Sequence, residues 1–473
     1  MQKPLEWSIR DFSGGLVDKL DDNELADNQA SDCQNVISTK IGSITSVPGQ
    51  VKLNSVELGG PIQGLHSYYN GAIRKFVAVA NGVPYYWDAI DKVFREITLP
   101  DEEYPTGLDT SAMVQFATLV NYMVSFNGVD KPWKWEVTTD ATTISVLENA
   151  PADGQYCVLF KEKLFTVPKS EPSTLRWSDS FAPEEWPEVN FWNIAKGDGD
   201  IITALVPYLG ELTIFKRYSI HSLRGTSIDD FVLDNVVPTI GCVGPRAVVQ
   251  EGLHLYFVSD EGICVYNGAK VTNLTRSKIP NLWDKINHEY IHKAVAGRWE
   301  GLLWFALPEN SNTFNNLVIL YDPLTGAFWP RRNIEVNCFQ EYNNGQKVLF
   351  YSGGSYDGFV RQQYTGKNDD DKAINSYWIG KAFDMGQPEY QKKLKKVLVS
   401  DGPNANDASI HLSLDYGEFQ ELTYKDGDDL VRRFNAPSDR CRYIRPKIVF
   451  NTKDKSFEVR GIMALYRPRL RPK

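Results

Sequence analysis

The sequence predicts an all-β protein: a β-propeller of six or seven blades, then a small C-terminal β-sandwich, with a short N-terminal arm containing one helix. The first observation is a repeat, because residues 81–88 (NGVPYYWD) return in related form at residues 127–136 (NGVDKPWKWE), each time between β-rich runs. The second is that strand-like runs follow one another from about Pro61 onward. Repeats of roughly 40–50 residues with short strands, a glycine turn and a tryptophan are typical of propeller blades.

The N-terminal arm, residues 1–60, is expected to include the segment that closes the last blade. A helix is predicted from about Asn23 to Asn35, because Asp21 or Asp22 can cap its first turn. Residues 42–49, with a glycine at the start and Pro-Gly at the end, indicate a hairpin.

The propeller is expected over residues 61–365. Runs of β-branched and aromatic residues predict its strands, among them residues 72–80, 83–88, 93–99, 164–167, 212–215, 253–258, 262–266, 302–306, 317–322 and 347–351. Six or seven sheets fit these runs, and six are favoured if the first or last unit is shared between the two chain ends. Such sharing removes exposed strand edges, which invite aggregation.

A linker and a second domain are expected after the propeller. Residues 366–376 are polar, charged and contain a glycine, which is typical of a linker. Residues 377–473 alternate as antiparallel strands with turn signals between them, and this spacing predicts a β-sandwich that ends in a basic tail.

Composition excludes several classes of protein. With 473 residues, 42% of them hydrophobic, the chain can bury a full-sized core, whereas the net charge of −9 argues against a dedicated DNA-binding protein. No stretch reaches the ~18 apolar residues of a membrane-spanning helix, and the N-terminus has no signal-peptide core, so we expect synthesis in the cytoplasm without a cleaved signal. The cysteines are far apart and are expected to be buried thiols: Cys33, Cys157, Cys242, Cys264, Cys338 and Cys441.

Residues 288–292 (HEYIH) fit the pattern H-E-x-x-H, which on a helix places two imidazoles on one face for zinc. On that helix, however, His288 and His292 would point away from an apolar stripe formed by Leu282, Trp283, Ile286 and Tyr290. A third ligand would have to come from Glu300 or Glu309. A solvated helix is therefore favoured over a metal site.

Other motifs give little support for catalysis. Residues 413–419 (SLDYGEF) resemble an Asp-box turn of sialidase-type propellers, although the aromatic residue comes one position early. Residues 197–200 and 369–371 are acidic but lack the ligand spacing of an EF-hand. Because P-loop, nucleophile-elbow and kinase motifs are also missing from the sequence, we predict no catalytic, cofactor-binding or metal-binding residues and do not expect an enzyme.

Two basic stretches stand out in this acidic chain, residues 391–396 (QKKLKK) and residues 466–473 (YRPRLRPK). The prolines make the tail a poor helix, so it is expected to be free to lie on a partner. Docking on an acidic protein surface and a merely solubilising role are both open, and contact with DNA is a weaker third alternative.

Several motifs, in this order along the chain, resemble one family. They are residues 12–16 (FSGGL), 33–36 (CQNV), 176–179 (RWSD) with Pro183 and Trp186, 241–246 (GCVGPR), 256–263 (YFVSDEGI) and 353–360 (GGSYDGFV). Together they are similar to the β-propeller tail hub or nozzle proteins of short-tailed bacteriophages, also called packaged-DNA stabilisation proteins. The H-E-x-x-H stretch and the basic tail are not part of this resemblance.

The resemblance implies a structural virion protein without a cofactor, made in the host cytoplasm. Such a protein forms a homo-oligomeric ring, with six copies favoured, between the portal and adaptor proteins and the tail needle or tailspike. The ring retains packaged DNA and conducts it at ejection without sequence-specific binding. Acidic subunits suit a conduit, because tight phosphate binding would stall the passage of DNA.

The alternative is a carbohydrate-binding or glycan-hydrolysing β-propeller, such as a receptor-binding tail protein. The imperfect Asp-box and the twelve tryptophans favour it. Several tryptophans, including Trp87, Trp133 and Trp177, fall within the repeats, where core packing explains them. A metallopeptidase is the third hypothesis and has the least support.

Overall fold

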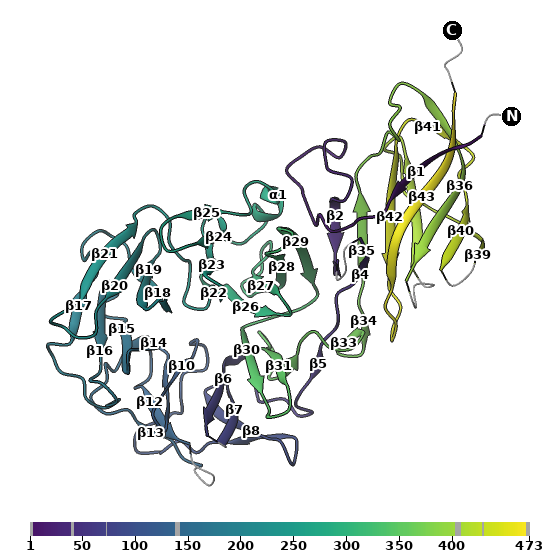
Figure 1. Ribbon diagram of the computed structural model, residues 1–473. Helices are drawn as coiled ribbons and strands as arrows, with labels where there is room; N and C mark the ends of the chain where they lie inside the picture. Colours follow the sequence, from purple (N-terminus) through teal and green to yellow (C-terminus); the bar gives the residue numbers. More distant parts are fainter. Residues whose placement is uncertain are drawn as a thin grey trace.

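The computed structural model describes residues 3–38, 42–71, 73–137, 142–402, 408–427 and 430–469. These residues form a ring of small sheets joined to a β-sandwich that contains the first and the last strand of the described ranges (Figure 1). Helical structure in these ranges is limited to α1 (Pro280–Trp283) and the 3₁₀ turn η1 (Ile291–Lys293). In the same ranges, none of the helices has the length and apolarity needed to cross a bilayer.

Seven four-stranded antiparallel sheets make up the ring in the described part of the chain. Blade 1 contains β6 (Ile62–Asn70), β7 (Ile73–Ala80), β8 (Val83–Asp88) and β9 (Val93–Glu96), and blade 2 contains β10 (Gln115–Leu119), β11 (Tyr122–Phe126), β12 (Trp133–Glu136) and β13 (Ser145–Val146). Blade 3 contains β14 (Gly154–Phe160), β15 (Lys163–Pro168), β16 (Thr174–Trp177) and β17 (Phe191–Asn193), and blade 4 contains β18 (Ile202–Tyr208), β19 (Glu211–Lys216), β20 (Ile220–Arg224) and β21 (Val232–Val237).

The remaining three blades complete the ring. Blade 5 contains β22 (Val248–Glu251), β23 (His254–Ser259), β24 (Gly262–Tyr266) and β25 (Val271–Asn273), and blade 6 contains β26 (Val295–Trp299), β27 (Leu302–Leu307), β28 (Leu317–Asp322) and β29 (Ala327–Arg332). Blade 7 contains β30 (Cys338–Asn343), β31 (Val348–Gly353), β32 (Val360–Gln362) and β5 (Val51–Lys52). The first strand of blade 7, β30, packs against the first strand of blade 1, β6. The prediction of a multi-bladed propeller is confirmed.

The repeat in the sequence marks equivalent turns of blades 1 and 2. Gly82 and Gly128 both have φ 76°, a left-handed conformation that suits glycine. A Cβ atom on Gly82 would lie 2.3 Å from the Leu108 carbonyl oxygen, so the turn also packs against the neighbouring loop. Trp133 and Trp177 are buried in the cores between blades, as expected, whereas Trp87 is only half-buried.

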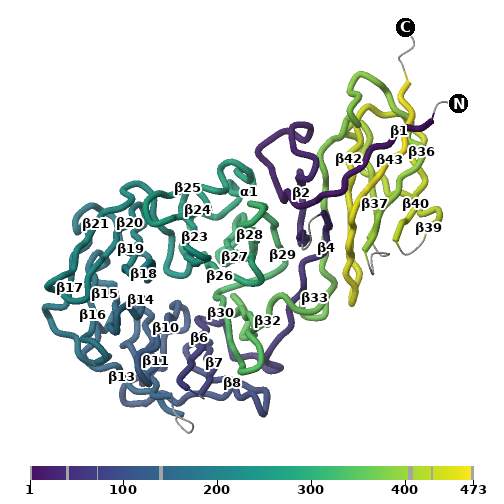
Figure 2. The backbone as a smooth tube through the Cα atoms, in the orientation of Figure 1, coloured from purple at the N-terminus to yellow at the C-terminus, as the bar shows by residue number. Residues whose placement is uncertain are grey.

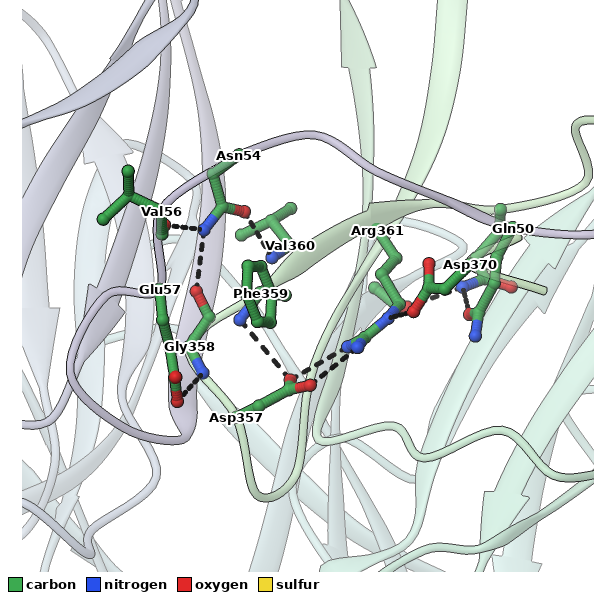
Figure 3. Close-up of polar contacts among 12 residues, drawn as sticks. Gln50, Asn54, Val56, Glu57, Asp357, Gly358, Phe359, Val360, Arg361 and Asp370 are labelled. Atoms are coloured by element: carbon green, nitrogen blue, oxygen red, sulfur yellow. Dashed lines mark hydrogen bonds and ion pairs between the residues drawn. The ribbon is translucent and has the colours of Figure 1, made fainter. Parts of the chain in front are cut away.

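The last blade is shared between the two ends of the chain. Strand β5 pairs with β32, with Lys52 opposite Arg361. The side chain of Asn54 donates to the Gly358 carbonyl oxygen over 2.8 Å and accepts from the Val360 amide over 2.8 Å (Figure 3). The predicted sharing is confirmed, but the preference for six blades is wrong, because the described ring has seven sheets and β5 adds the fourth strand of the last one.

The C-terminal part is a sandwich of two sheets. The eight-stranded sheet contains β3 (Val36–Ile37), β4 (Ile44–Ser46), β43 (Glu458–Arg469), β36 (Gln391–Asp401), β40 (Val431–Asn435) and β39 (Tyr424–Gly427), with β1 (Leu5–Ile9) paired to β43 and β41 (Arg440–Cys441) paired to β36. The five-stranded sheet contains β2 (Ala30–Gln34), β35 (Ser376–Gly380), β42 (Ile444–Phe450), β37 (Ser409–Leu414) and β38 (Gln420–Glu421). Their facing side chains belong to a hydrophobic core that continues into the propeller.

The predicted N-terminal helix is wrong. Residues 21–29 form turns, and the segment then enters the sandwich as β2, where Cys33 pairs with Trp378 of β35. Cys33 is fully buried there, and Asn35 ends the strand with φ 55°. Burial in a sheet therefore outweighs the local capping signal, which is worth only about 1 kcal/mol.

The N-terminal segment also fastens the sandwich to blade 6 (Figure 2). The Leu16 amide donates to the Phe328 carbonyl oxygen over 2.8 Å, and the Asn35 amide donates to the Pro330 carbonyl oxygen over 2.9 Å. Gly15 has φ 66°, and a Cβ atom there would lie 2.8 Å from the Phe328 nitrogen. We call residues 3–60 the strap, because they contribute strands to the sandwich and to blade 7.

The segment predicted as a linker, residues 366–376, contains a hairpin of β33 (Asn368–Asp369) and β34 (Lys372–Ala373). Asp369 forms a 2.7 Å ion pair with the buried guanidinium of Arg331 in blade 6. The Asp370 amide donates to the Gln50 carbonyl oxygen over 3.1 Å. These contacts hold the segment to both the strap and the propeller.

Candidate functional site

The axis of the propeller is lined by polar and charged residues from several blades. An open cavity of about 910 Å³ lies at one mouth of the axial channel, lined by β22, β26, β30 and Tyr69. Arg298 stands between two carboxylates there, 3.4 Å from Glu251 and 3.4 Å from Glu341. Glu251, Arg298 and Glu341 belong to the first strands of blades 5, 6 and 7, so exposed ion pairs connect these three blades at the mouth.

A second cavity of about 210 Å³ continues the channel and is lined by Arg246 and His66. The Arg246 guanidinium donates to three main-chain carbonyls from three blades, those of Asn337 (3.0 Å), Gln63 (2.5 Å) and Val114. Gly64 leaves the space that this side chain needs, because a Cβ there would lie 3.2 Å from the guanidinium. Burial lowers the pKa of Arg246 from its ordinary value.

His66 lies beside this arginine. Its Nε2 is 2.9 Å from the Thr118 hydroxyl, and its ring stacks on Phe116 with centroids 5.4 Å apart. Burial lowers the pKa of His66 to about 4, so the imidazole is neutral near pH 7. Burial also raises the pKa of the Cys338 thiol, which lines the same cavity, to about 11. In the second cavity Arg246 is therefore the fixed cation, His66 is neutral near pH 7, and the Cys338 thiol is not activated.

The H-E-x-x-H stretch does not form the predicted helix. Helix α1 ends at Trp283, and the Asn287 amide donates to the Pro308 carbonyl oxygen over 2.8 Å instead of continuing the helix. His288 lies in a turn and His292 in η1, so the two histidines do not share a helical face. Across the described ranges, no group of three or more His, Cys, Asp or Glu side chains is placed to hold a metal ion.

The Asp-box-like stretch is a hairpin turn of the sandwich and lies outside the propeller. The Asp415 carboxylate accepts from the backbone amides of Arg442 (2.7 Å) and Tyr443 (2.8 Å). The Gly417 amide donates to the Leu414 carbonyl oxygen over 2.9 Å. Asp415 therefore fixes two loops of the sandwich against each other.

The acidic stretches are used for structure. Asp198 forms a 2.6 Å ion pair with the buried ammonium of Lys216. Asp370 forms a 2.6 Å ion pair with Arg361, next to the closure of blade 7 (Figure 3). All six cysteines are free and buried, as the sequence predicts.

The two basic stretches of the sequence meet in the sandwich. Lys393 of β36 lies directly opposite Arg467 of β43 and opposite Arg440 of β41. We call these three residues the basic row. The expectation of a free tail is wrong for residues 466–469, which belong to β43, while residues 470–473 lie outside the described residues. Strand register between segments far apart in the chain is invisible in one sequence, so the row could not be predicted.

Comparison with known proteins gives no family. No protein-family model and no curated protein matches the chain. Among solved structures, the computationally designed Ika8 protein is similar with 12% identity and a TM-score of 0.38, covering 76% of this chain and 99% of that one. The structure of U3-55K is similar with 9% identity and a TM-score of 0.43, covering 67% of this chain and 98% of that one.

Proposed function

We propose that this chain is a structural subunit of the tail of a short-tailed bacteriophage, a hub or nozzle protein. In this role it connects the portal and adaptor to the distal tail, retains packaged DNA and conducts it at ejection. The observation that carries the proposal is the fold: the resemblance implies a propeller followed by a β-sandwich, and the chain has both in that order.

The motifs behind the resemblance lie where parts of the molecule are joined, which supports the proposal. Phe12 is buried against Trp378 of the sandwich, with ring centroids 4.9 Å apart. Arg246 ties three blades at the axis. Gly358 lies in the closure of blade 7, where a Cβ would be 2.4 Å from the Leu58 nitrogen (Figure 3). Residues at such junctions serve the folding and assembly of a structural subunit rather than catalysis.

The mechanism is mechanical and electrostatic. A head-to-tail ring needs one heterologous interface repeated around an axis, and it closes only if the rotation per subunit divides a full turn. Six copies are favoured by the resemblance. With a net charge of −9, each subunit repels DNA weakly, so DNA in the lumen stays mobile. The protein is located in the virion tail and acts without catalysis.

The test is assembly. The purified chain is mixed with the portal and adaptor proteins of the same phage and followed by sedimentation velocity and electron microscopy. The expected result is a ring, formed either alone or on the portal and adaptor complex. A chain that stays monomeric and does not bind that complex contradicts the proposal.

A glycan-binding or glycan-hydrolysing propeller is the second candidate. It is favoured by the open cavity of about 910 Å³ at the channel mouth, where Tyr69, Gln250 and Glu341 are available for contacts with sugar hydroxyls. A glycan array and a glycosidase screen test this candidate. Binding or hydrolysis that is lost in a Tyr69→Ala variant would support it over the tail hub.

A further inference from the structure

The basic row carries three positive charges without a matching carboxylate. Residues directly opposite in neighbouring strands have Cβ atoms about 5 Å apart, and like charges at that distance repel. Lys393 has such a neighbour on each side, Arg440 and Arg467. In the described part of the chain none of the three forms an ion pair, and the Arg467 Nε is buried without a hydrogen-bond acceptor.

Other arginines on this sheet or directly beside it do have carboxylate partners. The pairs are Arg10 with Glu6 (3.6 Å), Arg433 with Asp426 (3.2 Å) and Arg460 with Glu458 (3.1 Å). The basic row is thus set apart in a chain that has nine more acidic than basic charges. Residues 470–473 (LRPK), which follow directly in the sequence, include no Asp or Glu.

An apolar groove of about 320 Å³ lies on the same outer face of the eight-stranded sheet. Leu398 of β36 and Met463 of β43 lie opposite each other in its floor, and Val431 of β40 extends it. All three side chains are half-buried, so part of their apolar surface is in contact with water. Strands β36, β40 and β39 lie on the side of the sandwich away from the propeller (Figure 1).

The groove and the basic row lie along one strand. Lys393 and Leu398 both belong to β36, and at roughly 3.3 Å per residue they are about 16 Å apart. An extended segment of about six residues spans this distance. Its apolar side chains would lie on Leu398 and Met463 while its carboxylates reach the basic row.

We propose that this outer face, defined by the basic row and the Leu398–Met463 groove, is a docking surface for an extended segment of a partner protein. The segment has apolar residues at one end and carboxylates at the other. Charge complementarity selects an anionic partner, and the apolar groove selects protein over DNA, because a sugar-phosphate backbone offers nothing to bury there. The inference does not depend on the proposed tail function.

The test measures binding of a labelled peptide, three leucines followed by four glutamates, to the full chain by fluorescence anisotropy. A triple variant, Lys393→Gln with Arg440→Gln and Arg467→Gln, is expected to bind the peptide about tenfold more weakly or worse, with less dependence on salt. A Leu398→Ser variant is expected to weaken binding severalfold. A second peptide has serines in place of the three leucines. Its binding to the wild-type chain is expected to be weakened severalfold, as is the binding of the first peptide to the Leu398→Ser variant.

The matched control is a triple variant with the same loss of charge on the propeller, Lys169→Gln with Lys270→Gln and Lys347→Gln, all exposed side chains. It is expected to bind the peptide like the wild type. Circular dichroism checks that every variant folds. Three results would each overturn the proposal: no binding of the acidic peptide, equal loss in the control, or stronger binding of a short DNA duplex than of the peptide. Loss of self-association in the basic-row variant would also overturn it, because the occupant would then be a second copy.

Discussion

At the scale of single residues, Arg246 connects three blades of the propeller. One guanidinium donates to the carbonyl groups of the residues just before β10 and β30 and to one within β6. A charged donor shared among three blades replaces the hydrogen bonds that the blades cannot make to one another near the axis.

We predict that Arg246→Gln destabilises the protein by about 2–4 kcal/mol, because the shorter amide leaves buried carbonyls unpaired. Guanidinium chloride unfolding followed by tryptophan fluorescence measures the change. Arg298→Gln is the control, since its ion pairs at the channel mouth are exposed and worth less than about 1 kcal/mol. Equal losses in the two variants would contradict the assigned role of Arg246.

His66 predicts a pH dependence of stability. Its pKa in the folded protein is about 4, below the value of about 6.5 in an unfolded chain. The unfolded state therefore takes up a proton between these values and the folded state does not, so stability is lost as the pH falls from 6.5 towards 4. Screening by water in the channel leaves about 1–3 kcal/mol for this effect.

A His66→Gln variant checks this pH dependence. Glutamine stays neutral and is expected to lose less stability than the wild type between pH 7 and pH 4.5, with all other titrating groups unchanged. The wild-type imidazole can also be titrated directly by NMR. A measured pKa near 6.5 for His66 would rule the prediction out.

At the scale of elements, the closure of blade 7 depends on a short strand. Strand β5 has only two residues, and Asn54 donates a hydrogen bond to Gly358, just before β32, and accepts one from Val360 of β32 (Figure 3). Because Asn54 is only 3% exposed, water cannot replace these bonds easily.

We predict that Asn54→Ala costs about 2–3 kcal/mol and speeds hydrogen exchange in β5 and β32 before the rest of the ring opens. Hydrogen–deuterium exchange with mass spectrometry measures the local effect. Asn344→Ala in the same blade is the control, because the Asn344 side chain is exposed and its oxygen accepts from the Gln346 and Lys347 amides within one turn. Uniform exchange across the ring in the Asn54 variant would argue against local opening.

Elements with strong local signals were predictable. The predicted strand at residues 302–306 is β27 (Leu302–Leu307), and the Asn-Gly turns at Gly82 and Gly128 have the expected left-handed glycines. Both predicted helices, one from a capping signal and one from an apolar stripe, failed. The first became β2 and the second broke after Trp283, in each case because the backbone pairs with a segment distant in sequence.

The candidate site was less predictable than the fold. Arg246 was noticed only as part of a motif, and its three carbonyl partners come from blades far apart in the chain. The basic stretches were visible in the sequence, but their side-by-side arrangement depends on the register of β36 with β43. Composition shows which charges are present, while only long-range pairing shows which of them meet.

At the scale of the whole molecule, the strap makes propeller and sandwich depend on each other. Strands β1 to β4 belong to the sandwich, and β5 belongs to blade 7. A chain that begins at residue 54 loses all five strands and leaves open edges in both parts.

We predict that this truncated chain aggregates or unfolds in separate low-temperature transitions, whereas the full chain unfolds cooperatively. Differential scanning calorimetry and sedimentation velocity distinguish the two behaviours. Adding a separate polypeptide of residues 1–60 in trans is expected to restore solubility at least in part. A truncated chain with an unchanged transition would show that the strap is dispensable.

The position of β5 also has a consequence for the order of events during synthesis. The strand leaves the ribosome early, yet its partner β32 emerges only after nearly all the blades have been made. The ring therefore stays open until β32 has been made, and its closing step follows the translation of residue 362. The propeller therefore reaches its closed fold late and in a single step. A nascent chain that stalls before that point exposes unpaired strand edges, which a chaperone would have to cover to prevent aggregation.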